Sequence, residues 1–185
     1  MEQPISTEKR QDTAANPLLV LILLGVAALY MTVMLFVGTR GFNNFMFKFF
    51  ELTPYAALIV GLILFPRKEK NLIFAIGFFA LAFYTMISCF SSLFNPRFGY
   101  AIIAFLLLGI CFAGYGAIGL SYFFAKEKFY TLKTLGAIAC VGISFVMMII
   151  NCFVLKGTWP VQILSFLFCT VPTCAAAILY TPFKK

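Results

Sequence analysis

The residues best suited to chemistry in this chain are one glutamate and a few uncharged polar side chains that interrupt long apolar runs. Burying an unpaired hydroxyl or amide in hydrocarbon costs roughly 2–7 kcal/mol, so such side chains need partners. An ionisable residue at membrane depth is a functional candidate by default, which places Glu51 first. The predicted ligand-binding residues are Glu51, Ser88, Ser92, Asn95, Asn151 and Gln162.

The spacing of these residues places several of them on common helix faces. Ser88, Ser92 and Asn95 are separated by intervals of four and three, and Gln162 precedes Ser165 by three. Positions three or four apart share one face of a helix. The pattern predicts a polar vestibule open to the outside, lined by the second, third, fifth and sixth predicted spans. A buried, unpaired glutamate there would suit coupling to a cation or a proton.

A simpler interpretation of the same residues stays open. Lys48 and Glu51 are three positions apart, so they can form an ion pair on one helix at the membrane interface. Hydroxyl groups inside a helix can donate to carbonyls of their own preceding turn. In that case the polar side chains are satisfied locally and form no vestibule.

Motifs of enzymes and metal sites are missing from the sequence. There is no histidine, no H-E-x-x-H, no G-x-S-x-G and no P-loop, and the only aspartate is Asp12 in the polar tail. We therefore expect no enzymatic activity, no catalytic residue, no metal site and no cofactor. No C-x-x-C pair occurs, so the six cysteines are interpreted as packing residues; they are Cys89, Cys111, Cys140, Cys152, Cys169 and Cys174.

Composition defines the solvent in which these residues are placed. The chain is 63% hydrophobic and 11% charged, with a mean hydropathy of +1.01. Soluble domains are about 45–50% apolar and about 25% charged, so lipid must surround most of this chain. The net charge of +8 fits basic cytoplasmic loops better than nucleic-acid binding. The predicted class is an all-α, multi-pass protein of the cell membrane, with the lipid bilayer as its partner and no nucleic acid.

The elements that position the polar residues are six predicted spans in a single domain, residues 17–181. A disordered polar tail (1–16) precedes them and a basic tail (182–185) follows. Ten of the fourteen Lys and Arg residues fall on the side that holds both tails, which predicts cytoplasmic N- and C-termini. The spans are about 17–38, 46–65, 72–94, 100–125, 134–155 and 160–180.

The second span is the weakest of the six. Its charge-free run is only Leu52–Phe65, which is short for a crossing. If it merely dips into the membrane, five spans remain and the charge bias is equally strong. Six spans are preferred because the apolar run Tyr55–Phe65 would otherwise stay unburied.

Small residues recur at intervals of four in the fourth and fifth spans. They let two helices approach closely, so these antiparallel spans are expected to pack together. The stripe also suits a helix that bends during a transport cycle, self-association, or contact with a partner membrane subunit. The predicted helix-packing residues are Gly109, Ala113, Ala117, Ser121, Gly136, Cys140 and Ser144.

The size and the six-span layout with both ends inside are similar to the substrate-binding membrane subunits of vitamin importers of the energy-coupling-factor type. The likeness is architectural: the first span has Ala28 and Thr32 four apart, without the run of paired alanines by which those subunits dock. It implies no binding residue here. The predicted function is a small transport or solute-binding membrane component, and the alternative is a non-catalytic assembly or scaffold protein.

Overall fold

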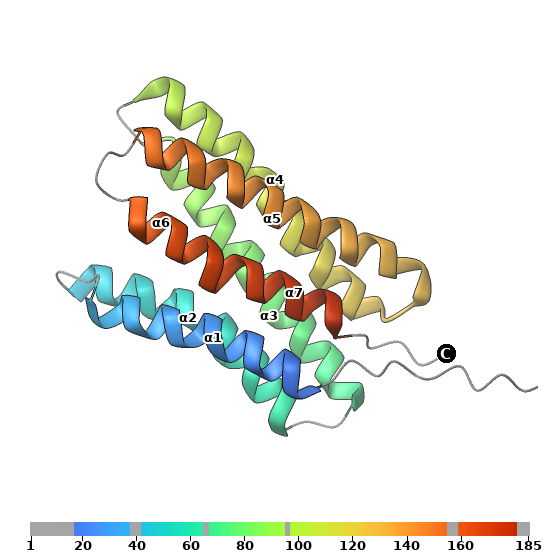
Figure 1. Ribbon diagram of the computed structural model, residues 1–185. Helices are drawn as coiled ribbons and strands as arrows, with labels where there is room; N and C mark the ends of the chain where they lie inside the picture. The colour runs from blue at the N-terminus through green and yellow to red at the C-terminus, as the bar shows by residue number, and fades with distance from the viewer. Residues whose placement is uncertain (1–16, 38–41, 65–66, 95–96, 155–158, 181–185) are drawn as a thin grey trace, which may run out of the picture.

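The computed structural model describes residues 17–37, 42–64, 67–94, 97–154 and 159–180, and this part of the chain forms an all-helical bundle (Figure 1). The predicted tails, 1–16 and 182–185, and Asn95 lie outside the described residues. The elements are α1 (Pro17–Val37), α2 (Phe42–Leu64), α3 (Arg67–Ser92), α4 (Phe98–Phe124), the short 3₁₀ helix η1 (Glu127–Phe129), α5 (Tyr130–Val154), α6 (Trp159–Ser165), the π-helical turn η2 (Phe166–Thr170) and α7 (Val171–Leu179). Because α6, η2 and α7 follow one another without a break, they make one sixth helix.

Five of these helices are long and apolar enough to cross a membrane: Pro17–Val37, Glu69–Ser92, Gly99–Phe124, Tyr130–Phe153 and Pro160–Leu179. Their outward faces carry large apolar side chains, among them Phe36 and Phe153, which are 74% and 77% exposed. Water would penalise so much exposed apolar surface, whereas lipid does not. The all-α prediction is confirmed, and the architecture is that of a multi-pass membrane protein.

Helix α2 is not among the five candidate spans. It nevertheless runs for 23 residues and begins at Phe42, earlier than the predicted start near Met46. Helix α3 likewise begins at Arg67, ahead of its predicted apolar run. These differences have one cause: a hydropathy pattern marks where lipid begins, but a helix continues past that level because its own backbone hydrogen bonds do not depend on lipid.

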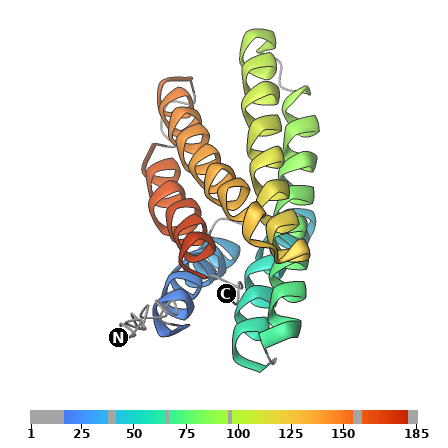
Figure 2. The ribbon, with the colours of Figure 1, turned by 90° about the vertical axis from the view of Figure 1, so that its right-hand side faces the viewer.

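Consecutive helices pack side by side along the bundle. Helix α3 lies against α4 and α4 against α5, while α1 contacts α2 and α7 (Figures 1 and 2). Helix α1 begins and α7 ends at the same end of the bundle (Figure 1). The opposite end holds the start of α2, the start of α4, the end of α5 and the start of α6.

A single apolar core joins the helices. Helix α1 buries Val20, Leu24, Ala27 and Met31, at the three- and four-residue intervals that define one helix face. Within this core, Phe78 of α3 stacks on Tyr122 of α4 with 5.7 Å between ring centroids. The core therefore contains phenol groups, whose hydroxyls need polar partners inside the bundle.

At the crossing of α4 and α5, two glycines bring the backbones of the helices close together. A Cβ on Gly114 would lie 2.6 Å from the Cys140 Sγ and 2.9 Å from the Gly136 carbonyl oxygen. A Cβ on Gly136 would lie 2.6 Å from the Gly114 carbonyl oxygen and 3.2 Å from the Ala117 Cβ. Glycine is required here because the two backbones are in contact.

The other stripe residues lie around this crossing or away from it. Ser121 is buried and donates to the Ile118 carbonyl at 2.7 Å, within its own helix. The Ser144 Oγ is 3.9 Å from the Cys111 Sγ across the same interface. Ala113 is exposed, and a Cβ on Gly109 would meet no atom within 4 Å.

We expect Gly114→Ala to destabilise the bundle, because the added methyl group meets backbone that cannot move aside. Overpacking of this kind costs about 1–3 kcal/mol, which should lower the melting temperature in detergent. Gly109→Ala is the matched control on the same helix, and its melting temperature should stay the same or rise. Equal melting temperatures for the two variants would contradict the close crossing.

Candidate functional site

The candidate site begins with an ion pair in the first half of α2. The Lys48 Nζ lies 2.5 Å from the Glu51 Oε2, one helical turn along. The Lys48 side chain is 35% exposed and that of Glu51 only 17%. A carboxylate so far removed from water needs a counter-charge, and Lys48 supplies it. Glu51 is therefore paired, as the simpler interpretation of the sequence required.

Tyrosines from the neighbouring helices surround this carboxylate. Tyr84 of α3 interacts with both Glu51 and Ser88. Tyr30 of α1 and Tyr55 of α2 also lie within electrostatic range of Glu51. The carboxylate thus lies near phenol groups contributed by three helices. We call Lys48, Glu51, Tyr30, Tyr55 and Tyr84 the Glu51 group.

The sixth helix contributes to the Glu51 group through its π-helical turn. The Tyr55 hydroxyl lies 2.8 Å from the Cys169 Sγ, and both groups are buried. The Thr173 hydroxyl donates to the Cys169 carbonyl at 2.6 Å. A π-helical turn inserts an extra residue into a helix and is frequent at functional sites. Here the turn brings Cys169 against Tyr55.

A second polar cluster lies at the same end of the bundle and joins α4, α5 and α6. The Tyr100 hydroxyl donates to the Asn151 Oδ1 at 2.7 Å, and the Asn151 Nδ2 donates to the Gln162 Oε1 at 3.3 Å. All three side chains are half-buried. The side-chain amides of Asn151 and Gln162 are thus hydrogen-bonded across helix interfaces. We call Tyr100, Asn151 and Gln162 the Asn151 group.

Tyr30 connects the two clusters. Its hydroxyl donates to the Val161 carbonyl at 3.2 Å, and it interacts with Ser165 on the next turn of α6. Gln162 of the Asn151 group lies between these two positions in the sequence. Helix α6 is therefore the element shared by both clusters.

The predicted ligand-binding residues do not all come together. Ser88 joins Glu51 through Tyr84, and Asn151 joins Gln162 directly. Ser92 instead donates to the Cys89 carbonyl of its own helix at 2.7 Å. Back-bonding of this kind satisfies a hydroxyl locally, so Ser92 has no need of a partner on another helix.

Sequence reasoning missed the tyrosines, because it searched for short polar side chains. Five of the eight tyrosines, Tyr30, Tyr55, Tyr84, Tyr115 and Tyr122, lie inside long apolar runs. A tyrosine within such a run could have been recognised as a candidate, since its hydroxyl needs a hydrogen-bond partner when it is buried.

Lys133 was also missed, because its position at the edge of an apolar run placed it among the loop charges. The structure places it inside α5, fully buried. Its Nζ donates to the carbonyls of Ile178 and Tyr180 at 3.2 Å and 2.9 Å. It also lies over the ring of Tyr122, 5.5 Å from the centroid. Lys133 therefore caps the C-terminus of α7, where a cation also opposes the helix dipole.

Tyr122 supports the same helix end. Its hydroxyl lies 2.7 Å from the Ala177 carbonyl oxygen and 3.1 Å from that of Tyr180. These contacts satisfy carbonyls that a helix C-terminus leaves without partners. The cap lies where α7 ends, at the end of the bundle opposite the end of α5 and the start of α6, the elements that carry Asn151 and Gln162 (Figure 1).

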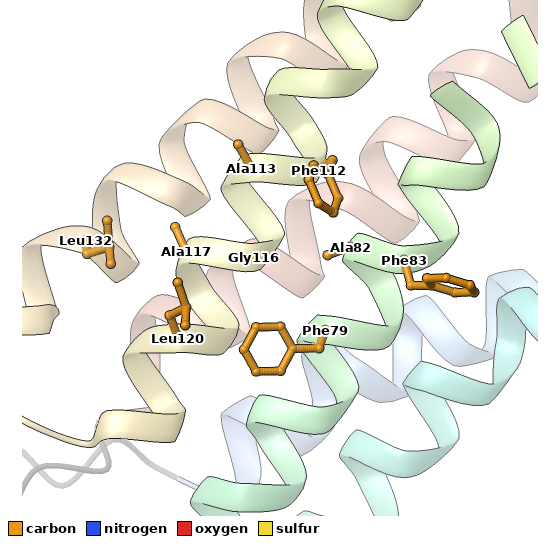
Figure 3. Close-up of a pocket in the computed structure, with 9 residues that line it drawn as sticks. All are labelled: Phe79, Ala82, Phe83, Phe112, Ala113, Gly116, Ala117, Leu120 and Leu132. Carbon is orange, nitrogen blue, oxygen red and sulfur yellow. The ribbon is translucent and has the colours of Figure 1, made fainter. Parts of the chain in front are cut away.

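An apolar groove of about 500 Å³ lies beside α4, away from these polar clusters (Figure 3). Its lining is formed by Phe79, Ala82, Phe83, Phe112, Ala113, Gly116, Ala117, Leu120 and Leu132. No lining side chain is polar, so the groove offers apolar contact and no hydrogen bond. The small residues Ala113 and Ala117 of the predicted stripe border it (Figure 3).

Metal chemistry finds no support in the part of the chain that the structure describes. No three His, Cys, Asp or Glu side chains come together there in an arrangement that could hold a metal ion. What the site offers is one carboxylate, one ammonium group, several phenol hydroxyls and paired amides. These groups bind by hydrogen bonds and charge.

Together the fold and the polar clusters define a class: an all-helical, multi-pass membrane protein with a carboxylate and its hydroxyl partners at one end of the bundle. Comparison with known proteins does not narrow this class, since no protein-family model, curated protein or solved structure matches the chain.

We expect Lys133→Met to destabilise the protein, because methionine keeps the apolar stem but removes the charged cap of α7. Hydrogen bonds to charged groups contribute about 1.5–3 kcal/mol, so the melting temperature in detergent should fall clearly. Lys126→Met, at an exposed lysine before η1, is the control and should leave the melting temperature unchanged. A similar effect of both substitutions would argue against the cap.

Proposed function

We propose that the chain crosses the cell membrane six times, with both ends in the cytoplasm. A helix of 23 residues is about 35 Å long, so α2 has the length to cross a hydrocarbon core of about 30 Å. An even number of crossings also fits α1 beginning and α7 ending at one end of the bundle (Figure 1). The distribution of Lys and Arg between the two sides supports the orientation.

This topology predicts the side from which the N-terminal tail can be cut. Trypsin should cleave after Lys9 or Arg10 in inverted membrane vesicles and leave the tail intact in sealed, right-side-out vesicles. An epitope at the C-terminus should become accessible in the same preparation as the tail. Tails exposed on opposite sides would show an odd number of crossings and would overturn the six-span arrangement.

Within this architecture, we propose a non-enzymatic role as a small transport or solute-binding component. The observation that supports it is the Glu51 group: a carboxylate only 17% exposed, paired with Lys48, interacting with Tyr84 of α3 and within electrostatic range of Tyr30 and Tyr55. Charged groups in the membrane are costly and uncommon unless they serve a purpose.

The polar end of the bundle suits a small hydrophilic solute. In the proposed orientation the Glu51 and Asn151 groups lie toward the outer side, where a solute arrives from water. Lys48 and Glu51 can exchange their mutual ion pair for contacts with a solute, and the phenol and amide groups can donate or accept hydrogen bonds. Because no charge would be left unpaired, the exchange would avoid the large cost of an isolated buried ion.

A second candidate role, membrane assembly, is favoured by a separate observation. Ala113 and Gly116 border the apolar groove on the outside of α4, whereas the α4–α5 crossing uses Gly114 and Gly136. A helix of a second copy or of a partner subunit could lie against such small residues. In this case the Glu51 group would be structural.

The decisive variant is Glu51→Gln, which keeps the size of the side chain and removes its charge. If the solute-binding role holds, Glu51→Gln should abolish the uptake of a solute that the wild type takes up from a panel of small polar solutes. It should equally abolish the rise in melting temperature that the bound solute causes in the wild type. The variant should still insert into the membrane. Glu69→Gln, at an exposed acid in the first turn of α3, is the matched control and should behave as wild type.

The two roles give opposite results in the same preparation. If the chain is an assembly protein, Glu51→Gln is silent, while Ala113→Leu removes a complex seen by cross-linking. Wild-type solute responses in Glu51→Gln would remove the solute-binding role. An unchanged complex in Ala113→Leu would remove the assembly role.

A further inference from the structure

The sixth helix consists of two α-helical segments separated by a π-helical turn. The turn, Phe166–Thr170, lies between α6 and α7 and is followed at once by Pro172. Proline has no N–H group, so it cannot donate to the Phe168 carbonyl four residues earlier. The π turn and the proline together weaken the backbone hydrogen bonding of the helix at one place.

The two segments are held very unequally. Helix α7 buries Pro172, Thr173, Cys174, Ala176 and Ala177 against the rest of the bundle. Among the described side chains of α6, residues 160–165, none is buried. Segments with little buried apolar surface open at low free-energy cost, whereas well-packed segments do not. Helix α6 is thus the loosely held half and α7 the firmly held half.

The bonds that hold each segment differ in kind as well. Helix α7 is capped by a fully buried lysine, Lys133, and by the buried Tyr122 hydroxyl. Helix α6 is held by the Tyr30 hydroxyl on the Val161 carbonyl at 3.2 Å and by the Asn151–Gln162 bond at 3.3 Å. These last bonds join half-exposed groups that water can also satisfy, so breaking them costs little.

A buried contact fixes the base of the turn. The Tyr55 hydroxyl and the Cys169 Sγ are 2.8 Å apart, and Thr173 ties the Cys169 carbonyl to α7. Motion of α6 would therefore pivot close to Cys169 and leave α7 in place. The same motion would separate Tyr30 from Val161 and Ser165, and Asn151 from Gln162.

We propose that the π-helical turn Phe166–Thr170 is a hinge, and that α6 is a gate over the Glu51 group. Closed, α6 joins the Glu51 and Asn151 groups through Tyr30 and Gln162; open, it exposes the Glu51 group to the aqueous side. The role of α6 as a gate rests on the proposed solute-binding function, whereas the hinge does not. A gate of this kind would let a solute reach a carboxylate that is otherwise only 17% exposed.

Hydrogen–deuterium exchange of the full-length protein in lipid nanodiscs, read by mass spectrometry, tests the hinge. The amides of residues 163–165 should exchange at least about tenfold faster than those of residues 102–104 near the start of α4, where Ala101 and Ala104 are buried. These two segments lie at the same end of the bundle, so unequal access of water does not explain a difference (Figure 1). Amides of residues 174–179 should be the slowest of the three.

A variant pair sharpens the measurement. Tyr30→Phe combined with Asn151→Ala removes both side chains that hold α6, and should speed exchange there roughly fivefold for each lost hydrogen bond. Exchange in α7 should not change. Lys133→Met should have the reverse pattern and speed exchange in α7 only. Equal exchange in α6 and at the start of α4, or a variant pair that leaves α6 unchanged, would overturn the hinge.

The hinge and the proposed function fail separately. Fast exchange in α6 together with wild-type solute responses in Glu51→Gln would keep the hinge and remove its role as a gate. Slow exchange in α6 together with loss of the solute response in Glu51→Gln would remove the hinge and keep the solute site.

Discussion

The constraint on which this structure depends is the absence of water around its polar groups. Hydrocarbon offers no hydrogen bond, so each hydroxyl, amide or charge inside the bundle must find a partner in the protein. Lys133 illustrates the outcome: it is fully buried, and its ammonium group donates to the carbonyls of Ile178 and Tyr180 at the end of α7. The carbonyls at the end of α7 thereby gain a hydrogen-bond donor, and the buried ammonium group gains acceptors. The same bonds tie α5 to the sixth helix.

The same constraint separates the two ends of the bundle. At the end with Lys133, the buried side chains of Lys133 and Tyr122 donate to carbonyls at the end of α7 and hold it. At the opposite end the polar side chains are half-exposed and bond to one another across helix interfaces, as Tyr100, Asn151 and Gln162 do. Half-exposed pairs can exchange their partners for water or solute at small cost. The bundle thus has one firmly fixed end and one end whose bonds can be exchanged.

Packing follows a second physical rule, which explains why only part of the small-residue stripe is used. Lipid is as apolar as leucine, so helices associate where backbones can approach closely. Gly114 and Gly136 provide that approach, with Cys140 and Ala117 beside them. Gly109 and Ala113 belong to the same sequence pattern but lie outside the crossing, because α5 passes over only one region of α4. A four-residue spacing identifies a helix face, while the crossing point depends on both helices.

The sequence by itself determined the solvent, the helical class and the approximate extent of the helices, because a polar backbone in lipid must satisfy its own hydrogen bonds and hydropathy is a local property. It also determined that Lys48 and Glu51 could pair, since three positions on one helix suffice. Only the tertiary structure decided which hydroxyls join Glu51, that Ser92 stays within its own helix, and that Lys133 belongs to α7. Those outcomes depend on contacts between residues far apart in the chain, for which no spacing rule exists. The contact between Cys169 and Tyr55 has the same origin, since it forms only once α2 and the sixth helix have come together.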